Sequence, residues 1–391
     1  MIPVAEALEH LFALVVPTET ETVPLREAAA RVLSAPVTAN RAQPPFDASA
    51  MDGYAIAEES PAAGALFRLI GEAAAGHAWT GRIGPGEAVR IFTGAPVPEG
   101  GKRVVIQEDV TREGDTITLS GSPDPGPHVR PKGGDFAEGA TIDPPRRLGP
   151  ADLSLLAAMN IARVPVHRRP VVALIATGDE LVQPGESPRP DQIIASNTYG
   201  LAAMVEAEGG EARLLPIARD TREALAQALD LADGADLVVT VGGASVGDHD
   251  LVGEVLGKHG SRAFYKVAMR PGKPLMAGRI GNAAMLGLPG NPVSSLVCGH
   301  VFLLPMLRAM QGLPAEPAPR RKAALAAPLG PNGPREHYMR ARVSAAGVTA
   351  FDRQDSSLLG ILAAADALIV RPPRDPARAA GTPVDILPVR P

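Results

Sequence analysis

Apolar and polar residues follow two different periods along this chain of 391 residues. Near the N-terminus, the apolar residues between Val4 and Val15 recur at helical spacing, which predicts an amphipathic helix. From Pro44 to about Asp143, short runs such as YAIA, FRLIGEA and TITLSG lie between turn residues, a pattern typical of a small β-domain. The N-terminal part of the chain is therefore expected to begin with this helix, to add a strand and a second short helix within residues 20–39, and to continue mainly as short strands.

After residue 169 the pattern changes to an alternation of strand-like and helical segments. The runs VVALIAT (171–177) and LVVTV (237–241) have strand character, and the segments 197–210 and 221–232 have helical spacing. Such alternation predicts a parallel or mixed sheet with helices on both of its faces.

A well-defined helix is expected near the end of this alternating region. Asn291 is a good N-cap, Pro292 suits the first helical position, and Gly312 marks the end. After the proline-rich run LPAEPAPR (313–320), the remaining sequence holds short strand-like runs and one short helical run, SSLLGILAAA. We therefore expect the chain to finish in a small β-barrel or sandwich.

Together these patterns predict a multidomain protein that combines α/β and β domains. We expect a central α/β domain with a mostly parallel sheet, a small β-rich domain inserted near the N-terminus, and a C-terminal β-barrel. The expected bounds are 1–43 with 140–168 for an N-terminal helical and linker domain that mediates dimerisation, 44–139 for the inserted domain, 169–316 for the α/β domain and 317–391 for the barrel.

Composition narrows the class of protein. A formal net charge of −5 and a pI near 5.9 argue against a nucleic-acid-binding protein, which usually carries a basic surface. The single cysteine, Cys298, leaves no disulfide framework and no cysteine-rich zinc or iron–sulfur site, and we expect it to be buried. The first residues, MIPVAEALEH, do not resemble a secretory signal. We therefore expect a cytoplasmic protein that has no membrane span and binds no nucleic acid.

The candidate ligand-binding residues lie in loops that follow the apolar runs. Three of them, GGASVGDHD (242–250), RPGKP (270–274) and PGNPVSS (289–295), are rich in glycine, proline and small hydroxyl residues. If the runs before them, among them FYKVAM (264–269), are parallel strands, all three loops emerge at the edge where open α/β sheets bind ligands. Backbone N–H groups, cations and carboxylates at that edge suit a phosphorylated ligand with a metal ion.

Carboxylates follow separate strands. Glu180 in TGDEL, Asp220 before a helix and Asp250 in the glycine-rich loop form a candidate magnesium cluster. Because magnesium keeps several waters and takes one or two protein carboxylates, not all three need to bind it directly. Taken alone, TGDEL is better explained as a strand-ending turn with solvated acids, and Asp220 alone would be a helix N-cap.

Cations, small residues and hydroxyls complete the candidate set. Lys266, Arg270 and Lys273 are expected to bind an oxyanion, with Lys266 and Arg270 on one strand face and Lys273 in a turn fixed by Pro274. The other substrate-binding candidates in the loops are Gly243, Ser245, Gly290, Asn291 and Ser294. For the last three, a capped helix without a ligand is an equally good explanation.

At these residues the chain closely resembles the molybdopterin molybdenumtransferase family, which includes the enzymatic domain of gephyrin. The resemblance covers nearly the whole chain. It rests on PPFDASAMDGYA (44–55), FTGAPVPEG (92–100), GGDFAEG (133–139), RPVVALIATGDELVQPG (169–185), GGASVGDHD, KVAMRPGKP, LGLPGNPVSS and EHYMRAR (336–342).

The resemblance implies a function and a quaternary structure. Members of the family insert molybdate into adenylylated molybdopterin, releasing AMP in a magnesium-dependent step. They are expected to be elongated homodimers, and transient contact with other proteins of cofactor biosynthesis is implied. The family's site lies between the α/β domain of one subunit and the β-domain of the other. Asp52 and Thr93 therefore become catalytic candidates, and Asp135 a substrate-binding candidate.

The resemblance also divides the loop residues by role. Glu180, Asp220 and Asp250 would handle magnesium or the phosphoanhydride, and Lys266 joins the catalytic candidates. Molybdate would be bound by Ser245, Arg270 and Lys273 together with Arg340 and Ser356 of the C-terminal domain. A tetrahedral dianion requires forked cations and hydroxyl donors of this kind.

Two other functions remain open. A molybdopterin adenylyltransferase would carry a similar α/β domain, but with a GGTG loop where this chain reads GGAS, and without the flanking domains. A non-enzymatic scaffold of the same fold would need an exposed groove for a peptide, and it would have no need of acids and cations in every loop.

Overall fold

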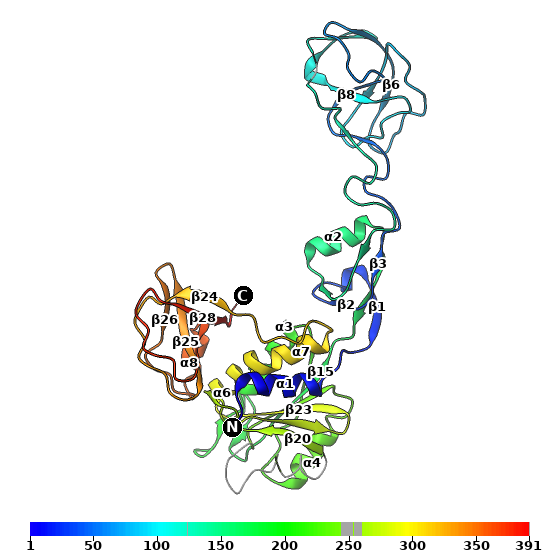
Figure 1. The fold of residues 1–391 in the computed structure, drawn as a ribbon. Helices are drawn as coiled ribbons and strands as arrows, with labels where there is room; N and C mark the ends of the chain where they lie inside the picture. Colours follow the sequence, from blue (N-terminus) through cyan, green and yellow to red (C-terminus); the bar gives the residue numbers. More distant parts are fainter. Residues whose placement is uncertain (123, 244–252, 254–259, 391) are drawn as a thin grey trace.

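The computed structural model describes residues 1–122, 124–243, 253 and 260–390 of an elongated molecule (Figure 1). An α/β domain and a smaller β-barrel lie side by side at one end, and a second β-domain lies at the other end of a narrow stem. These parts agree with the fold class predicted from the sequence.

The α/β domain is built on a six-stranded sheet in which β22 reverses the chain direction. Its order is β18 (Glu211–Leu214), β15 (Val171–Ala176), β19 (Leu237–Val241), β23 (Ala283–Leu288), β22 (Met276–Ile280) and β20 (Gly260–Tyr265). The first four strands are parallel, and β22 is antiparallel to both of its neighbours. Because of this double reversal, β20 runs in the same direction as β23, and its following loop emerges at the same edge.

Helices cover both faces of this sheet. One face packs against α1 (Val4–Leu14), α3 (Asn197–Ala207), α6 (Pro292–Cys298) and α7 (Leu304–Met310), and the other against α4 (Arg222–Asp230). A π-helical turn, Gly299–Leu303, joins α6 to α7. The sequence grouped α1 with the N-terminal domain, whereas its apolar side chains complete the core of the α/β domain.

The continuous helical segment Pro292–Met310 is long and apolar enough to cross a membrane by length and composition alone. Of the apolar stretch of 18 residues within this segment, 78% is buried inside the protein, as expected for a core helix. Cys298 lies in this segment and is fully buried, and that burial raises the pKa of its thiol.

The stem is formed by two passes of the chain. Its four-stranded sheet has the order β1 (Thr20–Pro24), β14 (Arg163–His167), β2 (Val32–Leu33) and β13 (Arg146–Arg147). A 3-10 turn, Leu25–Glu27, follows β1 in the chain, and α2 (Pro150–Ala158) lies between β13 and β14. Nearer the far domain, β3 (Val37–Thr38) pairs with β12 (Thr141–Ile142). The far domain is therefore an insertion between two paired strands.

The inserted domain contains a six-stranded sheet. Its order is β8 (Arg103–Ile106), β5 (Gly53–Ile56), β7 (Glu87–Ile91), β6 (Leu66–Ala73), β10 (Thr116–Leu119) and β9 (Val110–Glu113), with a 3-10 turn at Gln107–Asp109 and a small pair of β4 (Ala48–Ser49) with β11 (Val129–Arg130). Two small apolar cores, separate from that of the α/β domain, fill it.

The C-terminal domain forms a barrel that shares a core with the α/β domain. Its sheet has the order β21 (Met269–Arg270), β25 (Glu336–Ser344), β27 (Ala367–Arg371), β28 (Pro383–Pro388) and β24 (Arg321–Ala324); β26 (Gly347–Ala350) pairs with β25, and α8 spans Leu359–Ala363. A bridge from Leu325, directly after β24, to Val348 of β26 links the last strand of the sheet back to the β25–β26 pair. Side chains of β25, β27 and β28 extend the large core around α6, so the two domains are packed together.

Two sequence predictions in this region differ from the structure. The run FYKVAM is not one strand, because β20 ends at Tyr265 and Lys266 takes a φ of 74°. The residues after this break form β21, which pairs with β25 of the C-terminal barrel. Lys266 and Arg270 therefore do not share a strand face.

Candidate active site

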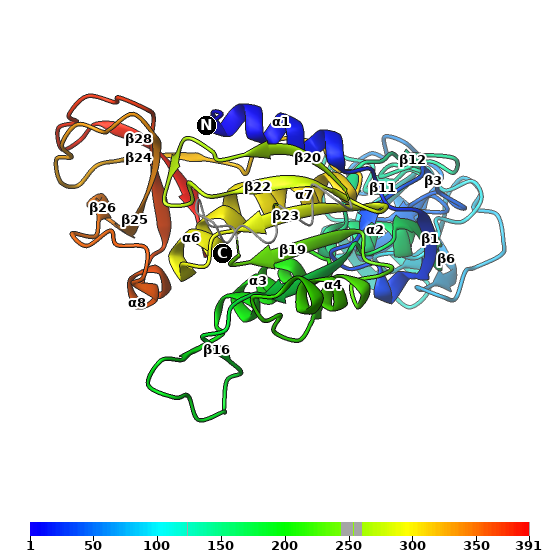
Figure 2. The ribbon, with the colours of Figure 1, turned by 90° about the horizontal axis from the view of Figure 1, so that it is seen from below.

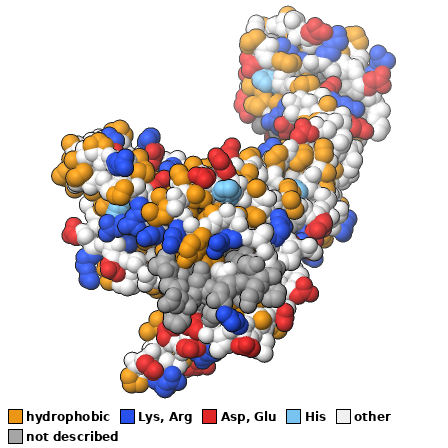
Figure 3. Space-filling model, turned by 60° about the horizontal axis from the view of Figure 1, so that its bottom comes forward, with side chains coloured by type: hydrophobic (Ala, Val, Ile, Leu, Met, Phe, Trp, Pro, Cys, Tyr) orange, Lys and Arg blue, Asp and Glu red, His pale blue; other side chains and the backbone are white. Residues whose placement is uncertain are grey.

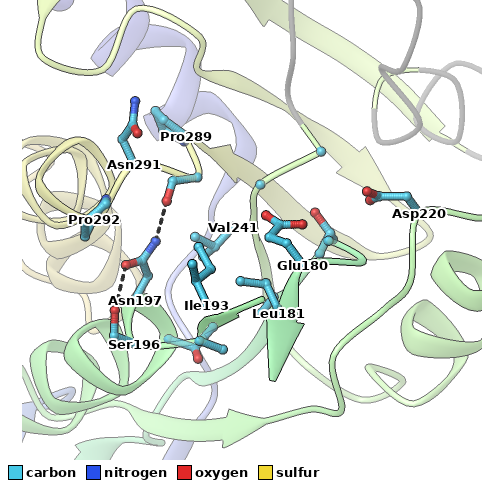
Figure 4. Close-up of a pocket in the computed structure, with 18 of the residues that line it drawn as sticks. Glu180, Leu181, Ile193, Ser196, Asn197, Asp220, Val241, Pro289, Asn291 and Pro292 are labelled. Carbon is cyan, nitrogen blue, oxygen red and sulfur yellow. Dashed lines mark hydrogen bonds between the residues drawn. The ribbon is translucent and has the colours of Figure 1, made fainter. Parts of the chain in front are cut away.

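A cavity of about 1170 Å³ lies at the sheet edge where β15, β19 and β23 end. It is lined by the loops after these strands, by the RPGKP turn, by the start of α3 and by Ser357 of the C-terminal domain (Figure 4). The short strands β16 (Leu181–Val182) and β17 (Ile193–Ile194) form part of the rim, and the segment between them projects from the domain (Figure 2). The sheet edge that the loop sequences predict as a binding site therefore borders a cavity in the structure.

Carboxylates mark one end of the cavity, which we call the carboxylate end and define by Glu180 and Asp220. Glu180 folds back over Gly178, where a Cβ atom would lie 2.4 Å from Oε2 and where φ is 148°. Only glycine accommodates both this contact and this backbone conformation. The glycine of TGDEL therefore determines where the Glu180 carboxylate lies.

Asp220 is held near Glu180 by contacts between their two loops. The Asp220 backbone N–H donates to Oδ1 of Asp179 at 3.2 Å, and Nη1 of Arg219 donates to the Asp179 carbonyl at 2.9 Å. The N-cap of α4 is Thr221, whose side chain accepts from Ala224. Asp220 is thus not the helix cap, and its side chain is exposed in the cavity lining.

Amide and hydroxyl groups mark the opposite end, which we call the amide end and define by Ser196, Asn197 and Asn291. Nδ2 of Asn197 donates to the Gly290 carbonyl at 2.7 Å, and the Ser196 hydroxyl donates to Asn197 Oδ1 at 3.4 Å. Asn291 precedes α6 but makes no side-chain capping bond. Its amide is left available at the cavity lining.

The glycine-rich loop enters the cavity at Gly242 and Gly243. A Cβ atom on Gly242, where φ is 98°, would lie 2.6 Å from the carbonyl oxygen of Thr177. Ser245 and Asp250, which the sequence places in the rest of this loop, lie outside the described residues. Within the part of the chain that the structure describes, no group of three His, Cys, Asp or Glu side chains is placed to hold a metal ion.

A cluster of arginines lies where the C-terminal barrel meets the α/β domain. In the pairing of β21 with β25, Arg270 is opposite His337, three residues before Arg340. Arg340 is fully buried, and its Nη2 donates to the carbonyls of Arg353 and Asp355 at 3.3 and 3.0 Å. Among the residues that the structure describes, its Nε and Nη1 have no hydrogen-bond partner. Because a buried unpaired donor is costly, these two nitrogens are suited to a bound anion.

Burial and neighbouring positive charges lower the pKa values of Arg340 and His337 in this cluster. Burial lowers the pKa of Arg340, an effect that Asp355 opposes and Arg270 adds to. Burial, together with the positive charges of Arg270 and Arg340, lowers the pKa of His337 to about 4. The imidazole is therefore neutral at neutral pH. Lys and Arg side chains also gather on the surface next to the C-terminal barrel (Figure 3).

The C-terminal domain also contacts the start of α6. The Val293 N–H donates to the Ser356 carbonyl at 3.1 Å, next to the buried Ser294. Ser357 lies beside Ser356 and lines the cavity. The C-terminal barrel thus brings Ser356 to the amide end of the cavity and Arg340 to the arginine cluster.

Comparison with known proteins agrees with this architecture along the whole chain. Residues 2–160 match the family model "MoeA N-terminal region (domain I and II)", 173–309 match "Probable molybdopterin binding domain", and 322–389 match "MoeA C-terminal region (domain IV)". A protein of Mycobacterium tuberculosis named molybdopterin molybdenumtransferase 2 is 37% identical over 93% of this chain and 94% of its own length. The chain belongs to the molybdopterin molybdenumtransferase family.

Further relatives support this membership. The molybdopterin molybdenumtransferase of Haemophilus influenzae is 38% identical over 76% of this chain and 74% of its own. The crystal structure of the molybdopterin biosynthesis MoeA protein from Pyrococcus horikosii superposes with a TM-score of 0.86 at 29% identity and covers 100% of both chains. The chain is thus a member of a transferase family, and the predicted family and fold class are confirmed.

Most of the described site candidates of the α/β and C-terminal domains lie in the cavity or at the junction of these two domains. The cavity lining includes Glu180, Asp220, Gly243, Lys273, Pro274, Gly290 and Asn291. Arg270, Ser294, Arg340 and Ser356 lie where the barrel and the α/β domain meet. Lys266 is not among the lining residues, and its Nζ lies 4.8 Å from the centre of the Tyr265 ring.

Three candidates lie away from this cavity, in or beside the inserted domain (Figure 1). Oδ1 of Asp52 accepts hydrogen bonds from the Thr93 backbone N–H at 2.7 Å and from the Thr93 hydroxyl at 2.8 Å. These bonds, with a smaller contribution from Arg90, lower the pKa of Asp52. Asp135 lies where its N–H donates to the Gln43 carbonyl, at the junction with the stem.

Sequence reasoning missed several residues of the cavity. Arg219 ties the two acidic loops together, and Asn197 ties α3 to the loop after β23. Ile193 and Ile194 are large apolar residues that remain 58% and 39% exposed at the cavity rim. The apolar pair directly before the predicted start of α3 was the signal that could have drawn attention to this rim.

Proposed function

We propose that this protein inserts molybdenum from molybdate into adenylylated molybdopterin and releases AMP in a magnesium-dependent step. The proposal rests on a cavity lined by carboxylates and Lys273, together with the fully buried guanidinium of Arg340, two of whose nitrogens have no partner among the described residues. A site that combines unsatisfied cationic donors with acids suits two oxyanions, a molybdate and a phosphate. The names of the relatives supply the identity of the pterin substrate.

The carboxylate end fits a magnesium ion. Magnesium prefers oxygen ligands and is commonly held by one or two carboxylates, waters and substrate phosphates. Glu180 and Asp220 both line the cavity and come from adjacent loops. When bound, the ion would neutralise charge on the leaving phosphate. Asp250 is proposed as a further ligand on the basis of its sequence position alone.

Molybdate is proposed to bind near Arg340, Arg270 and Lys273, with hydroxyl donors from Ser356 and Ser245. Arg340 is fixed by its bonds to the carbonyls of Arg353 and Asp355, so its remaining donors are oriented before the anion arrives. Such preorganised donors stabilise negative charge without reorganisation during the reaction. The neighbouring positive charges also repel one another, and a dianion relieves that repulsion.

A homodimer is proposed to complete the site. Asp52 and Thr93 lie in the inserted domain, at the far end of the stem from the cavity of the same chain (Figure 1). Phe46 and Met51, close to Asp52 in sequence, are large apolar residues with 39% and 41% exposure. Apolar exposure beside a hydrogen-bonded carboxylate favours an interface with a second subunit, whose cavity Asp52 would then face.

The test is molybdenum insertion by the purified protein. Adenylylated molybdopterin, molybdate and magnesium should yield molybdenum cofactor and one AMP per product, with no AMP when molybdate is left out. Asp220→Ala and Lys273→Ala should abolish the reaction. Asp230→Ala and Lys322→Ala are the matched controls, because these exposed residues do not line the cavity. Consumption of ATP with free molybdopterin would instead identify an adenylyltransferase, and full activity of both loop variants in cells would favour a scaffold.

A further inference from the structure

We propose that the amide end of the cavity is the subsite for the pterin ring, with Asn197 as its specificity-determining residue. This inference rests on the proposed function and deepens it, because it assigns the two ends of one cavity to two parts of one substrate. The phosphate part lies at the carboxylate end, and the pterin lies against Asn197, Asn291 and the apolar rim formed by Ile193 and Ile194.

The two ends of the cavity differ in chemistry. One presents the carboxylates of Glu180 and Asp220, and the other presents the amides of Asn197 and Asn291 and the Ser196 hydroxyl (Figure 4); Lys273 also lines the cavity. Between them lie the apolar side chains of Val241, Ile193 and Leu181 (Figure 4). A ligand that spans this cavity therefore has a charged end and a neutral, hydrogen-bonding end joined across an apolar middle.

Asn197 is held so that its remaining hydrogen-bonding groups have a fixed orientation. An asparagine amide carries two N–H donors and two acceptor lone pairs. One N–H is used by the 2.7 Å bond to the Gly290 carbonyl, which also fixes the plane of the amide. The second N–H remains for a ligand, and so does acceptor capacity on Oδ1 beside the long contact from Ser196. A donor next to an acceptor matches the amino and carbonyl edge of a pterin.

The apolar rim provides a surface for the face of a flat ring. Ile193 and Ile194 pair with Leu181 and Val182 of the two-residue strand β16, and both line the cavity while 58% and 39% exposed. Leaving two isoleucines exposed at a cavity costs free energy that burial against an aromatic ring would recover. A phosphate or a metal ion would gain nothing from such a surface.

The size of the cavity agrees with this division. Small-molecule sites in proteins have volumes of about 300–1,000 Å³, and this cavity measures about 1170 Å³. It is large enough for a pterin and a nucleotide phosphate together, and larger than molybdate or AMP alone would require.

The test measures binding of each half of the substrate separately. The probes are 6-hydroxymethylpterin, which is fluorescent and has no phosphate, and AMP with magnesium. Asn197→Ala and Ile193→Asp should each weaken binding of the pterin about tenfold, while the affinity for AMP stays within about twofold of wild type. Asp220→Ala should show the reverse. Asn282→Ala, at a turn on the opposite edge of the sheet, should change neither.

Ile193→Asp keeps the test valid even if Asn197→Ala disturbs the contact between α3 and Gly290, since the Ile193 side chain is largely exposed. The subsite is refuted if wild type does not bind the pterin, if both variants bind it as wild type does, or if Asp220→Ala weakens it equally. Failure of molybdenum insertion by a wild-type protein that binds the pterin through Asn197 would refute the proposed function and leave the subsite intact.

Discussion

The fully buried Arg340 donates to the carbonyl of Asp355 at 3.0 Å, and within the described part of the chain its Nε and Nη1 have no partners. A buried cation with unsatisfied donors lowers stability unless a ligand completes it. The C-terminal barrel therefore carries a group that is unfavourable for folding and favourable for binding an anion.

Arg340→Met tests whether Arg340 lowers the stability of the fold while it strengthens the binding of an anion. The variant should unfold at the same temperature as wild type or higher, because an unpaired buried charge is removed at similar volume. Molybdate affinity should fall about 100-fold or more, the loss of two charge-assisted hydrogen bonds. Calorimetry of unfolding and of molybdate binding measures both effects. A variant that is much less stable yet binds molybdate normally would show that Arg340 has a structural role only.

Thr93→Val tests the pair that Thr93 forms with Asp52. Valine keeps the backbone N–H donor but removes the hydroxyl, so the pKa of Asp52 should rise towards its ordinary value of 3.8. We expect activity at neutral pH to fall about tenfold without loss of stability, and Thr93→Ser to restore it. NMR titration of Asp52 and steady-state rates provide the measurements. Unchanged activity would place the pair outside the reacting site.

His337 should make the stability of the barrel depend on pH. Its pKa of about 4 in the folded protein lies below the ordinary value of 6.5, so the unfolded chain binds the proton more readily between these values. The free energy of unfolding should therefore fall as the pH drops from 6.5 towards 4, by at most about 3 kcal/mol for this group.

His337→Phe should remove that part of the pH dependence, as measured by urea unfolding at pH 7, 5 and 4. Burial and the charge of Arg308 also lower the pKa of His300 to about 4, so the variant should retain the share due to His300. The exposed His77→Gln is the control. Parallel pH profiles for His337→Phe and wild type would contradict the prediction.

Gly178→Ala should displace the Glu180 carboxylate. The added methyl group meets Glu180 Oε2 at 2.4 Å, and φ of 148° is unfavourable for alanine. A strained backbone of this kind costs about 1–3 kcal/mol, and misplacement of a site residue by about 1 Å can cost roughly 100-fold in rate.

Gly234→Ala is the matched control, because its φ is also positive, at 75°, but its Cβ would have no neighbour within 4 Å. It should lose stability through backbone strain and keep its activity. If both variants lose activity equally, strain alone explains the effect and the Glu180 contact is not important.

The sequence predicted the edge of the sheet where the cavity lies because polar and glycine-rich loops follow apolar runs, a local signal. It could not predict that Lys266 breaks the strand before Arg270, since that break depends on the C-terminal barrel offering β25 as a partner. For the same reason α1 was assigned by position along the chain, whereas its packing is decided by a core that forms from distant segments.

The site shows the same limit. Asp220 and Thr221 are both suitable N-caps by residue type, and the structure uses Thr221. Asn197 carries no motif of its own, and its position depends on the Gly290 carbonyl, 93 residues away in the chain. Residue type and spacing thus indicate which loops matter, but contacts between loops decide which side chains remain available for a ligand.

The way in which the far domain joins the stem has a practical consequence. Thr38 pairs with Thr141, and Gln43 lies opposite Phe136, so the chain leaves and re-enters the stem as the two arms of a hairpin. Residues 44–135 could be replaced by a tight turn without disturbing the α/β or C-terminal cores. Such a shortened chain keeps its cavity but lacks Asp52, and it could be mixed with a full-length chain whose cavity is inactivated. Recovery of activity in the mixture would show that Asp52 of one subunit serves the cavity of the other.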